Sequence, residues 1–121
     1  MDMPFLNAMK RMSVPIAFQW YGWNEHLFDN NYPHFLPAIS GFKERVKELV
    51  DSGALIVPYI NGLSADSKIA DWDKYDPYAI KDEEGGLRQK FYWDGAGRLT
   101  PMCPSQVPWR HTISNLIDKM V

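Results

Sequence analysis

Two short apolar runs joined by one amphipathic helix constrain what this chain can fold into. The runs are Val14–Tyr21 and Ala54–Asn61, and both are rich in the branched and aromatic residues that favour β-strands. Between them, Gly41–Ser52 places its apolar residues at helical spacing, and Gly53 follows where a left-handed residue commonly ends a helix. This order predicts a βαβ unit with two adjacent parallel strands and the helix packed across them.

The remaining elements are expected around this unit. The continuous apolar character of the two runs predicts strands that are buried on both faces. Ser40 is the expected N-cap of the central helix. A short amphipathic helix is expected over Phe5–Met12, and a last helix opens near Ser105 and Pro108 and continues through Trp109. The expected order is therefore α-β-α-β-α.

Long loops follow both predicted strands, over Gly22–Ile39 and Gly62–Pro104. Connections in α/β folds usually take about 2–6 residues, and the loops at the carboxyl ends of parallel strands form the functional sites. A small hairpin is expected inside the second loop, where Lys90–Trp93 and Arg98–Thr100 flank a glycine-containing turn. Both loops are thus expected to serve a binding site.

Two parallel strands alone cannot cover both faces of a sheet and close its edges. A (β/α)₈ barrel takes about 250 residues, or roughly 31 for each strand–helix unit, so 121 residues fit its early part. We interpret residues 1–121 as a single α/β domain that forms part of a larger TIM-type barrel. Its open edges favour self-association. The alternative is a complete small α/β domain with further strands between Gly62 and Pro104.

Composition excludes several classes of function. The net charge is −2, which lacks the basic excess of a general nucleic-acid-binding protein. Cys103 is the only cysteine, so an internal disulfide and a multi-cysteine zinc site are both excluded. The histidines have no metal-binding spacing, and the glycines form no phosphate-binding or dinucleotide motif. No apolar run reaches 18 residues. We expect no metal, no cofactor, no nucleic acid and no membrane partner.

Aromatic residues make up 14% of the chain, and several stand near the predicted strand ends. Sugar rings pack their flat C–H faces on aromatic rings, while their hydroxyls bind amides and carboxylates. Trp93, in the second loop, is a further aromatic candidate, and Asp66 is a further candidate for a hydroxyl ligand. The expected sugar-binding residues are Trp20, Trp23, Asn24, Asp29, Tyr59 and Asn61.

Each candidate also has a structural interpretation. Trp20 fits a core position, and the other aromatic residues can simply cover the mouth of a barrel. Asparagine and aspartate favour turns. Glycoside hydrolysis needs two carboxyl groups about 5–10 Å apart, and no acidic residue occupies the last position of a predicted strand. No catalytic residue is therefore assigned within this chain.

Four stretches of the chain together resemble a bacterial family of uncharacterised, glycosidase-like barrel proteins: Phe18–Glu25, Phe28–His34, Gly53–Gly62, and Met102–Ser105 leading to Trp109. The likeness spans about Pro15 to Val121. The family is similar to the retaining α-galactosidase-type barrels and is common in polysaccharide-degrading gut bacteria. The resemblance implies that the six candidates bind sugar and that the catalytic carboxylates follow the helix that ends this chain.

The resemblance therefore implies part of a carbohydrate-active barrel protein, a glycoside hydrolase whose 121-residue piece is inactive alone. The alternative is a non-catalytic carbohydrate-binding or structural α/β domain. For the full-length protein, an extracytoplasmic or periplasmic location is favoured.

Overall fold

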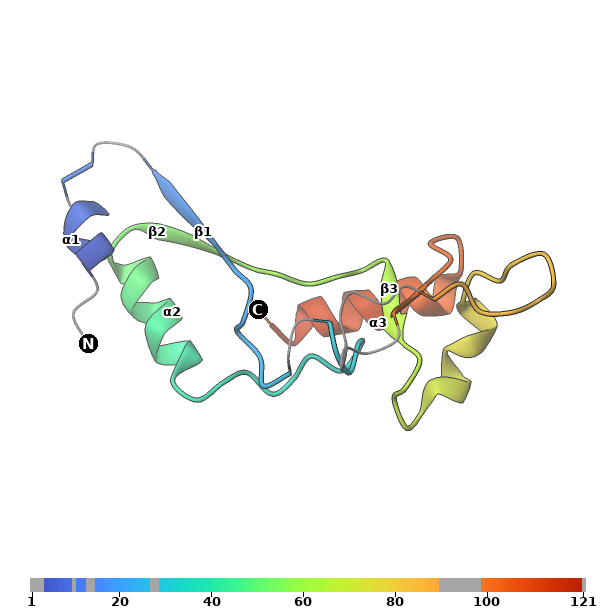
Figure 1. Cartoon of the computed structure of the whole chain (residues 1–121). Helices are drawn as coiled ribbons and strands as arrows, with labels where there is room; N and C mark the ends of the chain where they lie inside the picture. The colour runs from blue at the N-terminus through green and yellow to red at the C-terminus, as the bar shows by residue number, and fades with distance from the viewer. Residues whose placement is uncertain (1–3, 10, 13–14, 27–28, 90–98, 121) are drawn as a thin grey trace.

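The two predicted strands lie side by side and run in the same direction. The computed structural model describes residues 4–9, 11–12, 15–26, 29–89 and 99–120. In it, β1 (Ile16–Trp20) pairs in parallel with β2 (Ala54–Pro58), as Figure 1 shows. Ile16 lies opposite Ala54, and Trp20 lies opposite Pro58, so the two carboxyl ends coincide. The predicted parallel pairing is confirmed.

The helix α2 (Phe42–Asp51) connects these strands and covers one face of them. Leu49 is buried against Ala54, and the inward side chains of both strands pack around this pair. Gly53 has a φ of 91°, which confirms the expected left-handed residue at the end of the helix. Ser40 is not the N-cap. Gly41 takes that position with a φ of 77°, so no side chain caps the first turn.

The opposite face of the two-stranded sheet is open. The exposed fractions of Leu55 and Val57 are 64% and 50%, and Ala17 and Gln19 are exposed beside them. Burial thus alternates along both strands, and the expectation of strands buried on both faces is wrong for this chain. The physical reason is that α2 packs on one face, whereas within the described ranges no element covers the other.

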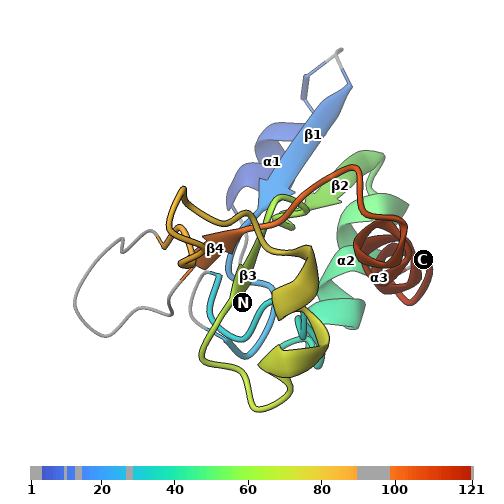
Figure 2. The same cartoon turned by 90° about the vertical axis from the view of Figure 1, so that its right-hand side faces the viewer.

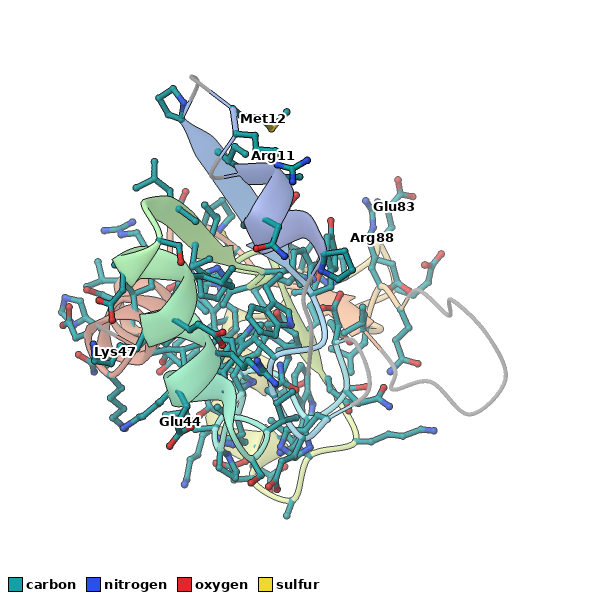
Figure 3. All side chains as sticks on the ribbon, turned by 90° about the vertical axis from the view of Figure 1, so that its left-hand side faces the viewer. Arg11, Met12, Glu44, Lys47, Glu83 and Arg88 are labelled. Carbon is teal, nitrogen blue, oxygen red and sulfur yellow. The ribbon has the colours of Figure 1, made fainter. Side chains whose placement is uncertain are left out.

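Two further helices lie at the ends of the chain. The first, α1, spans Pro4–Met9. The last, α3, spans Val107–Asp118 and has a proline in its first turn, as expected. It buries Trp109 and Leu116, whereas Ile117 is 43% exposed. The charged side chains of Glu44 and Lys47 on α2 are exposed to solvent (Figure 3).

The second long loop carries structure that the sequence predicted only in part, namely the expected hairpin arm Arg98–Thr100, which overlaps its last strand. It contains β3 (Ser64–Asp66), the 3₁₀ helices η1 (Trp72–Lys74) and η2 (Asp76–Tyr78), and β4 (Leu99–Pro101). Figure 2 shows β4 beside β3, and the two strands pair antiparallel in a sheet separate from β1 and β2. The first arm and the turn of the expected hairpin lie outside the described residues.

Two aromatic-rich clusters fill the interior, and α3 contributes to both. The first cluster joins the loop after β1 to the end of α3, and the second joins the second long loop to the start of α3. Their buried members are Trp23, Tyr32, Phe35 and Leu116 in the first, and Ala65, Ala79, Met102 and Trp109 in the second.

An ion pair links the two long loops at the surface. The His34 Nε2 atom lies 2.8 Å from Asp71 Oδ1, and the Lys74 Nζ atom lies 3.3 Å from Asp71 Oδ2. The hydrogen bond from His34 is the main reason why the pKa of Asp71 is lowered, and Lys74 lowers it further against the opposing effect of partial burial. The Asp71 carboxylate is therefore favoured in the folded chain.

We expect Asp71→Asn to lower the free energy of unfolding near pH 5 by up to about 1 kcal/mol, since the pair is partly exposed. Because the pKa of Asp71 is lower in the folded chain, its stabilisation is present above the ordinary value of 3.8 and is lost as the pH falls through the folded pKa. Urea unfolding at several pH values measures the difference, with the exposed Asp73→Asn as control. A difference that stays constant into strong acid would contradict this expectation.

Candidate functional site

Parallel pairing places two tyrosines next to each other at the carboxyl edge of the sheet. Trp20 and Pro58 are the last paired residues, so Tyr21 and Tyr59 are the next ones along each chain. The Tyr59 N–H continues the ladder by donating to the Trp20 carbonyl at 2.8 Å. The two phenol rings stack with centroids 4.4 Å apart and an interplanar angle of 18°.

The second part of the site is a hydrogen-bonded cluster around the Asp29 carboxylate. Asp29 Oδ2 accepts from the Tyr59 hydroxyl at 3.3 Å and from Asn61 Nδ2 at 3.1 Å. Asp29 Oδ1 is buried and meets no hydrogen-bond partner in the described part of the chain. The first long loop thus places a carboxylate against the end of β2.

Tyr32 links this cluster to the core. Its side chain is fully buried, and its hydroxyl accepts from the Asn61 N–H at 2.5 Å. Burial is the main cause that raises the pKa of Tyr32 well above its ordinary range. The Asn61 N–H acts in the opposite direction, and the charge of Asp29 raises the pKa further. Tyr32 therefore stays neutral and can donate its proton to the Asp29 carboxylate.

Three of the predicted site residues come together here: Asp29, Tyr59 and Asn61. Asn61 also has the structural role that the sequence left open. Its Oδ1 accepts from the Leu63 and Ser64 N–H groups at 3.0 and 3.2 Å, which fixes the turn after β2.

Trp23 is a core residue in this structure. It is 1% exposed and packs near Phe35 and Phe42, with ring centroids 5.9 and 5.7 Å away. Its Nε1 donates to the Tyr59 carbonyl oxygen at 2.7 Å. The expected stacking of this indole on a sugar does not fit its burial, because no face of the ring is accessible. Its observed role is to hold Tyr59 in place.

Trp20 and Asn24 also have structural roles. Trp20 is half-buried on the side of the sheet that α2 covers, and it meets Phe42 edge-on at 5.0 Å. Asn24 is 7% exposed, and its Oδ1 accepts from the His26 N–H at 2.9 Å within a turn. The core position fits Trp20 and the turn position fits Asn24, as their structural interpretations allowed. Direct contact of either residue with sugar stays a prediction.

Asp66 holds the two long loops together. It is 5% exposed, and its two carboxylate oxygens accept from the Asn31 and Lys68 N–H groups, each at 2.9 Å. The turn interpretation of Asp66 therefore fits its contacts. Trp93 lies outside the described residues.

Sequence reasoning missed Tyr21 and Tyr32. Strand register could have identified Tyr21, because a residue that follows β1 must lie beside the one that follows β2. No local pattern distinguishes Tyr32 from a surface loop residue, since its burial depends on contacts with Phe35 and Asn61.

Two cavities flank Tyr59. One, of about 260 Å³, is lined by Tyr21, Gly22, Asn24, Glu25, His26, Ile39 and Tyr59. The other, of about 540 Å³, is lined by Tyr59, Ile60, Asn61, Gly62, Leu63, Ser64 and Pro101.

The part of the chain that the structure describes holds neither a metal-binding cluster nor a membrane-spanning helix. There, no three side chains of His, Cys, Asp or Glu gather closely enough to hold a metal ion. Over those ranges, no helix has the length and apolar character needed to cross a membrane.

The fold is shared with part of known glycosidases. It matches an α-N-acetylgalactosaminidase from Bifidobacterium bifidum with a TM-score of 0.71 and 20% identity, over 98% of this chain and 21% of that one. It also matches an α-galactosidase from Thermus thermophilus with a TM-score of 0.60 and 17% identity, over 97% of this chain and 24% of that one. The fold is therefore a mixed α/β arrangement of the kind found in glycoside hydrolases.

Residues 2–121 match the family described as Domain of unknown function (DUF6259), and the chain belongs to that family. A protein of Bacteroides thetaiotaomicron named "Putative glycoside hydrolase" is 33% identical over 90% of this chain. A Monosiga brevicollis protein named "Putative glycoside hydrolase 22789" is 28% identical over 93% of it. The chain spans 16% and 11% of the lengths of these relatives. The resemblance to glycosidase-like proteins is confirmed.

Proposed function

We propose that this chain is part of a glycoside hydrolase barrel and supplies strand-end loops that bind sugar hydroxyls. The cluster of Asp29, Tyr59 and Asn61 at the carboxyl end of β2 carries this proposal. Loops at that end of parallel strands form the active sites of barrel enzymes. A carboxylate, a phenol and an amide offer both acceptors and donors, which is what a polyhydroxylated ring requires.

The two solved structures that share this fold guide the choice of sugar. The Bifidobacterium neighbour has been solved with N-acetylgalactosamine, and the Thermus neighbour with p-nitrophenyl α-D-galactopyranoside. We propose a sugar of the galactose configuration for this chain. A neutral hydrogen bond adds about 1 kcal/mol net and one to a charged group about 1.5–3 kcal/mol, so Asp29 should contribute most among the polar groups.

The catalytic carboxylates are proposed to lie outside this chain. β1 ends at Trp20 and β2 at Pro58, so neither strand presents an acid at its last position. Hydrolysis requires a pair of carboxyl groups on the two sides of the scissile bond. The same observation favours the second candidate function, a non-catalytic carbohydrate-binding or structural domain. A strand ending in Asp or Glu in the polypeptide after Val121 would decide for the enzyme.

Asp29→Asn tests the proposed binding. We expect the 121-residue chain to bind galactose weakly, and we expect this change to weaken binding about tenfold or more, because it removes charge-assisted hydrogen bonds. Saturation-transfer NMR measures binding, with the exposed Asp73→Asn as control. Unchanged binding by Asp29→Asn would contradict the role of the cluster.

No hydrolysis of p-nitrophenyl α-galactoside is expected from this chain. Measurable turnover would contradict the proposal that the catalytic carboxylates lie outside it.

Two further proposals concern the association of this chain and the location of the full-length protein. We propose that the open face of the β1–β2 sheet, where Leu55 and Val57 are exposed, leads copies of this chain to associate.

We also propose an extracytoplasmic or periplasmic location for the full-length protein. A signal sequence and cell fractionation of the source organism would test the location, and recovery in the cytoplasm would contradict it.

A further inference from the structure

Tyr21 carries the accessible aromatic surface at the carboxyl edge of the sheet. It is 49% exposed, whereas Trp23 is 1% exposed and Trp20 is half-buried on the side that α2 covers. Alternation along β1 explains the difference. Trp20 points toward α2, so the next residue lies on the open face of the sheet. Tyr59 occupies the same position after β2, and its ring supports the ring of Tyr21.

Polar groups surround this aromatic surface in the cavity of about 260 Å³. Asn31 Nδ2 donates to the His34 carbonyl oxygen at 3.3 Å, which fixes the orientation of the amide. The same Nδ2 lies 3.2 Å from His26 Nε2, so that ring nitrogen accepts and the neutral imidazole carries its proton on Nδ1. His26 thus provides a donor and the exposed Glu25 provides an acceptor.

We infer that this cavity binds one pyranose ring, with Tyr21 as the stacking surface and with Glu25 and His26 as hydroxyl partners. The inference rests on the proposed carbohydrate function and names a subsite beside the Asp29 cluster. Small-molecule pockets usually measure roughly 300–1,000 Å³, so a cavity of about 260 Å³ suits a single ring. Tyr59 joins the two parts, because its ring backs Tyr21 while its hydroxyl donates to Asp29.

The test compares Tyr21→Ala with Tyr21→Phe in the 121-residue chain. The probes are galactose and N-acetylgalactosamine, and saturation-transfer NMR measures their dissociation constants. Loss of the ring should weaken binding about fivefold to tenfold, whereas phenylalanine should retain most of it, because the stacking face remains. Leu63→Ala in the neighbouring cavity is the matched control and should leave binding unchanged. Circular dichroism verifies that each variant is folded.

The outcomes separate this inference from the function on which it rests. If the unmodified chain binds sugar and Tyr21→Ala binds equally well, the subsite is wrong and the proposed function stands. If Leu63→Ala weakens binding as much as Tyr21→Ala does, the ring lies in the other cavity and the subsite is also wrong. If the unmodified chain binds neither sugar, the proposed binding function fails.

Discussion

Replacing Trp23 with alanine is expected to destabilise the chain by about 3–5 kcal/mol, the usual cost of truncating a buried tryptophan. The indole is 1% exposed and packs near two phenylalanines. The change also leaves the Tyr59 carbonyl oxygen without the N–H that it accepts at 2.7 Å. Small domains are stable by only about 5–15 kcal/mol, so much of the stability should be lost. Urea unfolding followed by circular dichroism measures the effect.

Two variants serve as comparisons for Trp23→Ala. Trp23→Phe keeps an aromatic ring in the core but removes the N–H donor, and it should cost clearly less than alanine. Tyr21→Ala removes an aromatic ring of which about half is exposed, at 49%, so its effect on stability should be smaller still. A loss of less than about 1 kcal/mol for Trp23→Ala would show that this residue is not a core residue.

Leu55→Lys is expected to convert an associated form of the chain to a monomer. Leu55 is 64% exposed at the centre of the open sheet face, and Val57 beside it is 50% exposed. If a second copy covers this face, an ammonium group at position 55 must lose its hydration there, which is costly without a partner. A net charge of −2 opposes association only weakly. Sedimentation velocity over a hundredfold concentration range measures the change.

The matched control for Leu55→Lys is Ile117→Lys. Ile117 is also apolar and 43% exposed, but it lies on α3 and not on the sheet. This change should leave association unaltered. A stable monomer of the unmodified chain at the highest concentration would contradict the role of the open face. Equal effects of the two variants would show that association depends on general apolar exposure.

The sequence predicted the βαβ unit because both strand segments are continuously apolar and the helix between them has its apolar residues at helical spacing. It did not predict that the strands are buried on one face only and that Leu55 and Val57 are exposed on the other. Apolar side chains suit a buried strand, but they do not show whether another element covers them. It also missed β3, which is only three residues long and so has no local periodicity. It marked most of β4 as the hairpin arm Arg98–Thr100 but did not predict that β4 pairs with β3, because Ser64 and Pro101 are far apart along the chain.

The candidate site was predictable where the strand-end rule applies. Tyr59 and Asn61 directly follow β2, so their meeting at the edge of the sheet follows from topology. Trp23 was misplaced because the chain turns back after β1, where the Trp23 N–H donates to the Tyr21 carbonyl at 2.6 Å. The indole is buried near Phe35 and Phe42, and composition cannot reveal such a turn.

The hydrogen bonds that Asp66 and Tyr32 form between the two long loops limit how these loops can change in evolution. Asn31 of the first loop donates to Asp66 of the second, while the Asp66 N–H donates to the Tyr32 carbonyl oxygen at 3.0 Å. The two loops therefore form one interlocked unit rather than two independent modules. A chimaera that takes only one of these loops from a relative would lose the hydrogen bonds between them. New binding specificities should therefore arise when the two loops are replaced or mutated together.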